Sequence, residues 1–174
     1  MSAPNSVRVL LLADTHLGPG QARRLIERLP RSLARADVIL HAGDIVDSSV
    51  LAALAKYAPV HAVLGNNDRN LELPSRWAAP LGGCEIAMVH DSGPSTGRAA
   101  RLRRWFPTAD VVVFGHSHIP WHQTDSLDGH VQHHVNPGSA MQRRRQPRCT
   151  AAWLHLRSGR VVDVKHFTVP SDDA

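Results

Sequence analysis

The stretch "DVVVFGHSHIPW", Asp110–Trp121, joins a run of valines and a phenylalanine to two histidines. The apolar run is typical of a buried strand, because continuous β-branched residues fit a strand that is covered on both faces. His116 and His118 follow Gly115, and in extended backbone residues i and i+2 point the same way. The pair therefore predicts one shared pocket, although an H-x-H pair alone is a weak signal and one ring could simply cap the strand.

Four further apolar runs also end in aspartate, asparagine or histidine. They are VRVLLLAD (7–14), DVILHAGD (37–44), VHAVLGNND (60–68) and CEIAMVHD (84–91). Helical patterns over 21–33, 48–57 and 97–106 separate several of these runs, and serines at the start of the second are candidate caps. The alternation predicts an α/β fold, in which polar strand ends are expected to converge at one edge of the sheet.

The end of the chain has a different pattern. Residues 149–169 form two alternating runs around Arg157-Ser158-Gly159-Arg160, which predicts an antiparallel hairpin. A length of 174 residues with 43% hydrophobic content predicts a single domain, 1–174, with a core over about 7–169.

Composition also bounds the location and partners of the protein. No run approaches the ~20 apolar residues of a membrane span, and the first residues do not resemble a secretory signal, so we expect a cytoplasmic protein. Cys84 and Cys149 form no disulfide framework and no C-x-x-C site. A net charge of +5 favours anionic partners in general and is a weak indication of phosphate.

The polar strand ends supply two carboxylates, one amide and four imidazoles. The residues are Asp14, His16, Asp44, Asn66, His90, His116 and His118. Oxygen and nitrogen donors without thiolate suit manganese, iron, cobalt, nickel or zinc. Seven donors exceed one tetrahedral ion but fit two ions that share a carboxylate, and metals about 3.5–4 Å apart can hold a bridging hydroxide as nucleophile. Each residue also has a structural alternative, such as a helix cap, a turn or a satisfied strand-end histidine.

The motifs D-x-H, GDIVD, GNND, VHD and GHSH, in this order, resemble the calcineurin-like metallophosphoesterase superfamily. The short chain and NPGS, Asn136–Ser139, are similar to its small YfcE-like branch, which also contains the retromer's phosphoesterase-like subunit. The resemblance implies a four-layer α-β-β-α sandwich with two β-sheets face to face.

The resemblance also implies roles for the polar residues. Asp14, His16, Asp44 and His118 would hold one metal ion, Asp44 would bridge, and Asn66, His90 and His116 would complete the second site. It further implies two divalent ions, with manganese expected and nickel, zinc, iron or cobalt as alternatives. The activity implied is hydrolysis of a small phosphodiester, and the catalytic set is expected to be Asp44, Asn66, Asn67 and Asp68.

Two positions depart from the family pattern. Many phosphatases of the superfamily have a histidine where this chain has Asn67, and an amide cannot serve as the general acid, a contribution of roughly 10²–10⁴-fold. This disfavours esters with poor leaving groups. The branch that the chain resembles often lacks this histidine too, and its members tend to be phosphodiesterases on model substrates. Asp91 stands where glycine is usual; it either orients a ligand imidazole or, as we prefer, caps the next segment.

Other polar residues near the motifs are less specific. His41 is expected to support the site or to belong to the core. A group of histidines after the GHSH motif is interpreted as surface or strand residues: His122, His130, His133 and His134. In the family the loop after NPGS approaches the site, so one arginine of 143–145 is a candidate for phosphate contact, and Arg145 is our choice; the alternative is a solvated loop.

Two other classes of function remain as alternatives. One is a scaffold that keeps the fold and binds a partner protein. Degraded metal ligands would favour this alternative, and none of the seven ligand positions in this chain is degraded. The other is a nuclease, which the basic charge allows but for which no clear stacking surface is evident. We expect no membrane partner, and self-association is possible.

Overall fold

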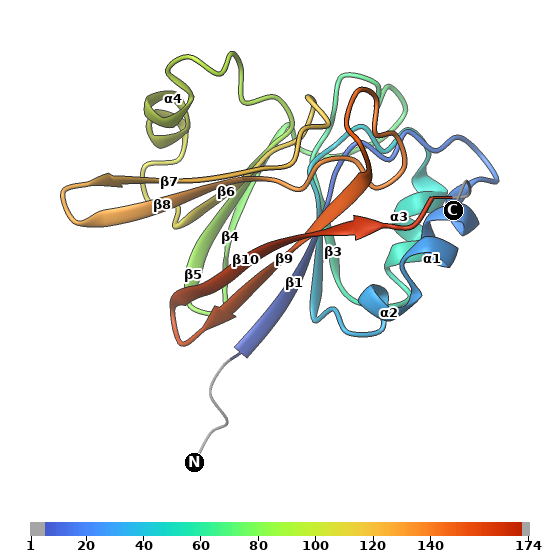
Figure 1. The fold of residues 1–174 in the computed structure, drawn as a ribbon, viewed down its shortest axis with the longest axis horizontal. Helices are drawn as coiled ribbons and strands as arrows, with labels where there is room; N and C mark the ends of the chain where they lie inside the picture. Colours follow the sequence, from blue (N-terminus) through green and yellow to red (C-terminus); the bar gives the residue numbers. More distant parts are fainter. Residues whose placement is uncertain (1–5, 172–174) are drawn as a thin grey trace.

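The first of two β-sheets in this computed structural model, which describes residues 6–171, has the order β10-β9-β1-β2-β3 (Figure 1). β1 (Ser6–Leu12), β2 (Val38–His41) and β3 (Val60–Ala62) run parallel to one another. β9 (Cys149–Arg157) pairs antiparallel with both β1 and β10 (Arg160–Val169). The last two strands are the predicted hairpin, which is thereby confirmed.

The second sheet has the order β4-β5-β6-β8-β7. β5 (Cys84–Val89), β6 (Val111–Val113) and β8 (His130–Asn136) are parallel. β4 (Arg76–Leu81) and β7 (Trp121–Leu127) pair antiparallel at its two edges. All five apolar runs of the sequence are therefore strands, each shorter than the run that predicts it.

Three strands, β4, β7 and β8, are not among those predicted. β4 alternates between exposed and half-buried residues, and β7 is exposed along most of its length. Edge strands of this kind carry little apolar signal because only part of one face is buried. The histidines at 122, 130, 133 and 134 lie on β7 and β8, which is compatible with their interpretation as surface or strand residues.

The four helices within residues 6–171 follow the predicted helical patterns with one break. Residues 21–33 form α1 (Ala22–Arg28) and α2 (Pro30–Leu33) instead of the single helix expected. Pro30 has no N–H to donate to the preceding turn, and its ring clashes with that turn, so the helix ends before it. α4 spans Arg98–Trp105.

The cap of α3 (Ser48–Leu54) also differs from the expectation. Asp47, and not a serine, is the capping residue, because its backbone is extended and its side chain accepts a hydrogen bond from the Ser49 N–H at 3.0 Å. None of the helices within residues 6–171 is long and apolar enough to cross a membrane.

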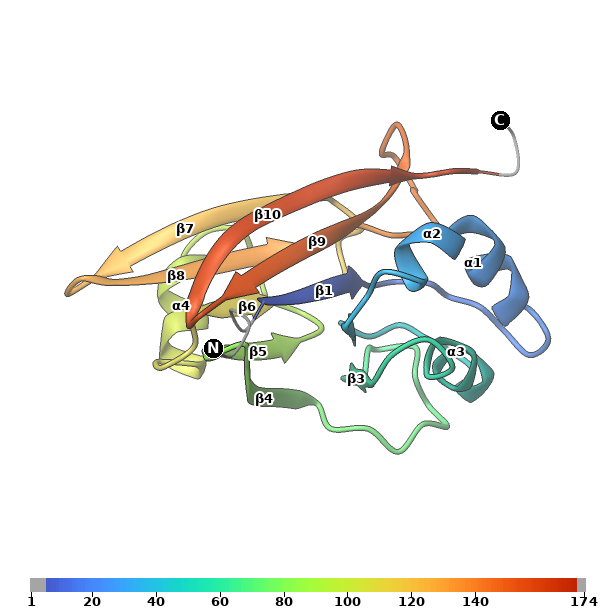
Figure 2. The same cartoon turned by 90° about the horizontal axis from the view of Figure 1, so that it is seen from below.

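Three apolar clusters fill the spaces between the layers. One lies between the first sheet and α1, α2 and α3 and includes Leu25 and Leu54. A second lies between the two sheets and includes Leu11 and Val113, and a third, with Leu102 and Phe114, lies under α4. The views in Figures 1 and 2 show helices on both outer sides of the paired sheets. This is the four-layer α-β-β-α sandwich that the sequence resemblance implies.

Candidate metal centre

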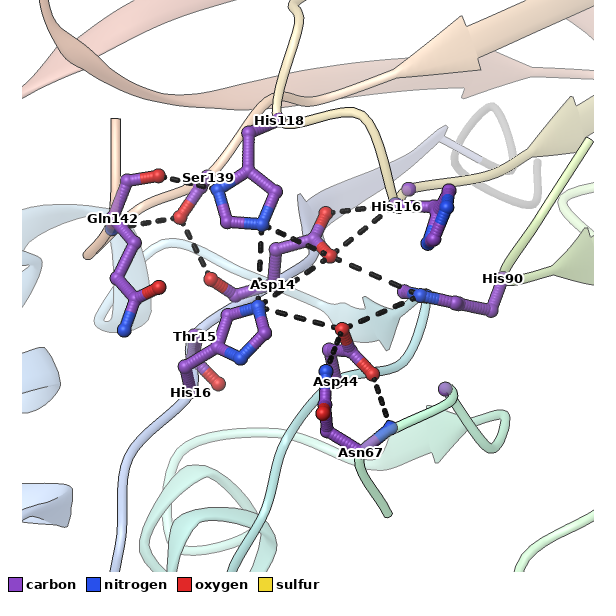
Figure 3. Close-up of polar contacts among 12 residues, drawn as sticks. Asp14, Thr15, His16, Asp44, Asn67, His90, His116, His118, Ser139 and Gln142 are labelled. Carbon is purple, nitrogen blue, oxygen red and sulfur yellow. Dashed lines mark hydrogen bonds and ion pairs between the residues drawn. The ribbon is translucent and has the colours of Figure 1, made fainter. Parts of the chain in front are cut away.

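Loops at the ends of five strands bring the seven predicted ligands together. Asp14 and His16 follow β1, Asp44 follows β2, and the others follow β3, β5 and β6: Asn66, His90, His116 and His118. Figure 3 shows most of these side chains pointing toward one another around the carboxylates of Asp14 and Asp44. Three of the five strands belong to one sheet and two to the other, so the centre spans both sheets.

The two carboxylates lie between the imidazoles. Asp44 Oδ2 is 3.4 Å from His16 Nε2 and 3.5 Å from His90 Nε2. Asp14 Oδ1 is 3.5 Å from His118 Nε2. Two sets of three potential ligand atoms, each within 4.8 Å of one another, share Asp14: one with His16 and His118, the other with Asp44 and His90.

The outer nitrogens of two rings bind backbone carbonyl oxygens. His118 Nδ1 contacts the carbonyl oxygen of Gln142, and His90 Nδ1 lies 2.7 Å from that of Ala42. Since a carbonyl oxygen only accepts, Nδ1 carries the proton in each ring, and the Nε2 lone pair faces the centre. This is the tautomer that a metal ion requires, held by the partner that usually orients a ligand histidine.

Asn66 completes the side of the centre next to β5. Its Oδ1 lies 3.1 Å from His90 Nε2 and 3.1 Å from His116 Nδ1. Without a metal ion, the Asn66 amide oxygen can only accept, so His90 Nε2 meets it best when protonated, which agrees with the raised pKa of this ring. A cation would satisfy both atoms.

The backbone of the ligand loops is strained. Asp14, His16, Asp44, His116 and His118 all have left-handed φ angles, between +47° and +71°. Residues with a side chain adopt this region rarely, and such strain of order 1–3 kcal/mol per residue gathers at functional sites. Gly65 makes room beside them, since a Cβ there would lie 2.2 Å from Asp44 Oδ1.

Asn67 and Asp68 both support Asp44. The Asn67 side chain donates to Asp44 Oδ2 at 2.8 Å, and its backbone N–H donates to Oδ1 at 2.9 Å. Asp68 accepts hydrogen bonds from the N–H groups of four residues: Asp44, Ile45, Val46 and Gly65. Its carboxylate therefore holds the loop that carries Asp44, and its described contacts do not reach the histidines.

Burial and hydrogen bonding shift the pKa values of the two carboxyl groups in opposite directions. Burial raises the pKa of Asp14 to about 7. Burial acts on Asp44 in the same direction, but hydrogen bonds with His90 and Asn67 outweigh it and hold the pKa of Asp44 below its ordinary value. Burial also lowers the pKa of His118 to about 4, so this imidazole is neutral at pH 7.

Several supporting residues could not be identified from the sequence. Ser139 Oγ donates to the carbonyl oxygen of Asp14 at 2.7 Å, and Asn136 Nδ2 donates to that of Gly115 at 3.0 Å. The NPGS motif thus fixes the two loops that carry Asp14 and His116, and the only sequence signal for this was its place in the family pattern. His41 is buried, with Nε2 3.0 Å from Thr15 Oγ1, and burial lowers its pKa to about 3.

The remaining candidates lie at the rim. Asp91 Oδ1 accepts from the Gly93 N–H at 2.7 Å, which is the predicted cap, while Oδ2 lies 4.0 Å from His116 Nε2. Arg144 Nη1 lies 3.4 Å from the carbonyl oxygen of His116. Arg145 lines a hollow next to the centre together with Ser117, Ile119, Arg144 and Gln146.

The donor set fits divalent transition metals. Carboxylate, amide and imidazole donors converge without a thiolate, and the protonated nitrogens of His90 and His118 point away from the centre. The structure thus places a candidate metal centre at the strand ends of a four-layer sandwich. The sequence profile of the calcineurin-like phosphoesterase superfamily domain matches residues 7–159, and the chain belongs to this superfamily.

Similar proteins agree with this assignment. A probable metallophosphoesterase of Methanothermobacter thermautotrophicus is 31% identical over 133 residues, which cover 74% of each chain. A crystal structure of a predicted phosphoesterase from Streptococcus pneumoniae has a TM-score of 0.73 at 21% identity, covering 96% of this chain and 94% of that one. Vacuolar protein sorting 29 from Cryptosporidium parvum has a TM-score of 0.72 at 18% identity, covering 94% and 98%.

Proposed function

We propose that the protein is a phosphodiesterase that works with two divalent metal ions, manganese being the expected metal. The position of Asp44 carries the proposal: its Oδ2 lies 3.4 and 3.5 Å from the nitrogens of two histidines on opposite sides. Asp14, His16 and His118 would hold one ion with Asp44, and a second group would hold the other with it: Asn66, His90 and His116. Two bound ions would supply Lewis acidity for the phosphoryl oxygens. They would also lower the pKa of the water molecule that attacks phosphorus, so that it could react as hydroxide.

The residues around the centre act mainly by holding the metal-binding side chains in position. Asn67 donates to the Asp44 oxygen that faces both histidines, so it fixes that carboxylate. His90 and His118 are held in their ligand tautomer by backbone carbonyls. Arg144 at the rim, and Arg145 in the hollow beyond it, supply positive charge for an anionic substrate.

The lack of a proton donor at Asn67 favours esters with good leaving groups, whereas the preference for diesters comes from the branch that the sequence resembles. The Asn67 amide is engaged with Asp44 and cannot act as an acid. His41 is buried with its Nε2 against Thr15 Oγ1, and burial lowers its pKa to about 3, so its imidazole is neutral at pH 7 and is a poor proton donor. Leaving groups that depart without protonation should therefore react best.

Two buried free cysteines fit the proposal that the protein acts in the cytoplasm.

Rates on two substrates test the proposal. With Mn²⁺, the protein should hydrolyse bis-p-nitrophenyl phosphate, whose nitrophenolate leaves unaided, and should be far slower on alkyl monoesters. The variant Asn67→His should raise the alkyl rate relative to the nitrophenyl rate, by up to about 10²-fold. Equal native rates on both would contradict the acid-free site, and metal binding without any turnover would leave the scaffold alternative.

A further inference from the structure

A hollow of about 470 Å³ lies beside the metal centre. Its walls come from the loop between β6 and β7, with Ser117 and Ile119, and from the loop between β8 and β9, with Arg144, Arg145 and Gln146. Arg144 of its lining lies 3.4 Å from the carbonyl oxygen of His116, and its charge acts on Asp14, so the hollow adjoins the centre. Its size is that of sites for small organic molecules, about 300–1,000 Å³.

Two arginines without an anionic partner line this hollow. Within residues 6–171, no carboxylate oxygen lies within 4.0 Å of the guanidinium group of Arg144 or of Arg145. Arg103, by contrast, pairs with Asp125 at 2.8 Å, and Arg8 pairs with Asp37 at 3.0 Å. The charge of Arg144 also acts on the centre, where it lowers the pKa of Asp14, so Arg145 is the lining arginine that is left for an anionic ligand.

The loop that carries these arginines is held in place. Gln142 N donates to Ser139 Oγ at 2.8 Å, and Gln146 N donates to the carbonyl oxygen of Arg143 at 2.9 Å. Arg144 adopts a φ of +51°, a strained conformation for a residue with a side chain. The turn that carries the two guanidinium groups is thus fixed by hydrogen bonds, and its segment contacts the loops that carry Asp14 and His116.

The opposite wall is partly apolar. Ile119 is 45% exposed and lines the hollow, although large aliphatic side chains are usually buried. A ligand that fits both walls has an organic body next to Ile119 and a negative charge next to the arginines. Two guanidinium groups match a phosphate dianion better than a carboxylate, which carries a single charge.

We infer that the hollow binds one of the two ester groups of the substrate, and that Arg145 pairs with a separate phosphate on that group. The substrate class is then a phosphodiester that carries a second phosphate on an organic body. This inference rests on the proposed function, because the hollow is a substrate site only if the ester is hydrolysed at the adjacent centre.

Binding of phenyl phosphate to the metal-free protein tests the hollow without turnover. In a ¹⁵N NMR titration, the amide signals of Ser117, Ile119 and Gln146 should shift and saturate. Arg145→Gln should weaken binding about tenfold or more, the effect of losing a hydrogen bond to a charged group. Arg148→Gln removes an exposed arginine of the same loop that does not line the hollow, and should change binding less than about twofold.

Two related compounds identify the recognised group. Benzoate should bind more weakly than phenyl phosphate, and phenol should not shift these signals. Equal binding of phenol would show a merely apolar hollow, and equal binding of benzoate would contradict the preference for phosphate. Unchanged phenyl phosphate affinity in Arg145→Gln would overturn the inference, even if bis-p-nitrophenyl phosphate is hydrolysed.

A matched pair of diesters then tests the substrate class with Mn²⁺ present. Thymidine 3′-phosphate 5′-(p-nitrophenyl phosphate) differs from thymidine 5′-(p-nitrophenyl phosphate) by one phosphate. We expect kcat/KM to be about tenfold higher for the first, with the advantage lost in Arg145→Gln and kept in Arg148→Gln. Equal values in the native protein would overturn the inference, whereas no turnover on either ester would instead refute the proposed function.

Discussion

Left-handed backbone occurs both in the turns of the two long hairpins and in the loops around the metal centre. The turns place glycine second, in Asp128-Gly129 and Ser158-Gly159, and a Cβ at Gly129 would meet nothing within 4 Å. Such turns match the twist of the strands they join, so they cost little. The centre puts histidine and aspartate in the same conformation, although glycine would relieve the strain. The difference shows which left-handed positions serve chain reversal and which serve side-chain placement.

Replacing one aspartate in each region should give the largest contrast. Asp44→Asn removes the charge between His16 and His90 and should lower kcat/KM on bis-p-nitrophenyl phosphate by about 10³-fold or more. Asp128→Asn makes the same chemical change in a turn, where asparagine tolerates φ of +50°. It should leave activity within about twofold of native. An Asp44→Asn enzyme that keeps a tenth of native activity would contradict the bridging role.

The pH dependence of Mn²⁺ binding should give the next largest effect. Asp14 has a pKa raised to about 7, so below pH 7 it is protonated and must lose its proton before it can bind a metal. Affinity should therefore fall as pH is lowered, by about tenfold per unit for one proton, and level off above pH 7. Burial lowers the pKa of His90, but the hydrogen bonds with Asp44 and the Ala42 carbonyl, together with the charges of Asp14 and Asp44, outweigh it and raise the pKa, which should steepen the fall.

Calorimetric titration with Mn²⁺ between pH 5.5 and 8.5 measures this dependence. The number of protons released, obtained from buffers of different ionisation enthalpy, should approach zero at high pH. An affinity that is constant across this range would show that the pKa of Asp14 is not raised to about 7 in the metal-free protein.

The smallest expected effect is a difference in the free energy of unfolding between variants of the hairpin turn and variants of the metal-centre loop. Gly129→Ala forces a side chain into a left-handed turn and should destabilise the protein by about 1 kcal/mol. His116→Gly should be about 1 kcal/mol more stable than His116→Ala in metal-free protein, because both lose the imidazole and only alanine retains the strain. Urea unfolding of the three variants measures both differences. Equal stability of the two His116 variants would show that this loop is not strained.

Much of the fold and of the candidate ligand set could be predicted because buried parallel strands have a strong apolar signal. Four of the five runs, those that end in Asp14, Asp44, His90 and His116, contain mostly buried strands, and the edge strand β3 before Asn66 is partly buried. β7 carries no such signal, since an exposed edge strand of mixed polar residues reads as a loop. The helix break at Pro30 follows from the local effect of proline, but the apolar stripe over residues 21–33 continues past Pro30 and therefore suggests a single helix.

The supporting contacts of the centre were harder to predict. Contacts such as Ser139 to the Asp14 carbonyl join residues 125 positions apart, and only the folded loops bring them together. The role of Asp68 depends on four N–H groups that point to one place, which no spacing in the sequence reveals. The position of Arg144 at His116 likewise depends on the turn after Gln142.

Anomalous diffraction at the manganese edge, from crystals grown with Mn²⁺, tests the central claim most directly. The account predicts two peaks per chain, one among Asp14, His16 and His118 and the other among Asn66, His90 and His116, with the Asp44 carboxylate between them. A peak at only one of these positions would contradict the two-metal centre. The absence of both would refute the assignment of these residues as ligands.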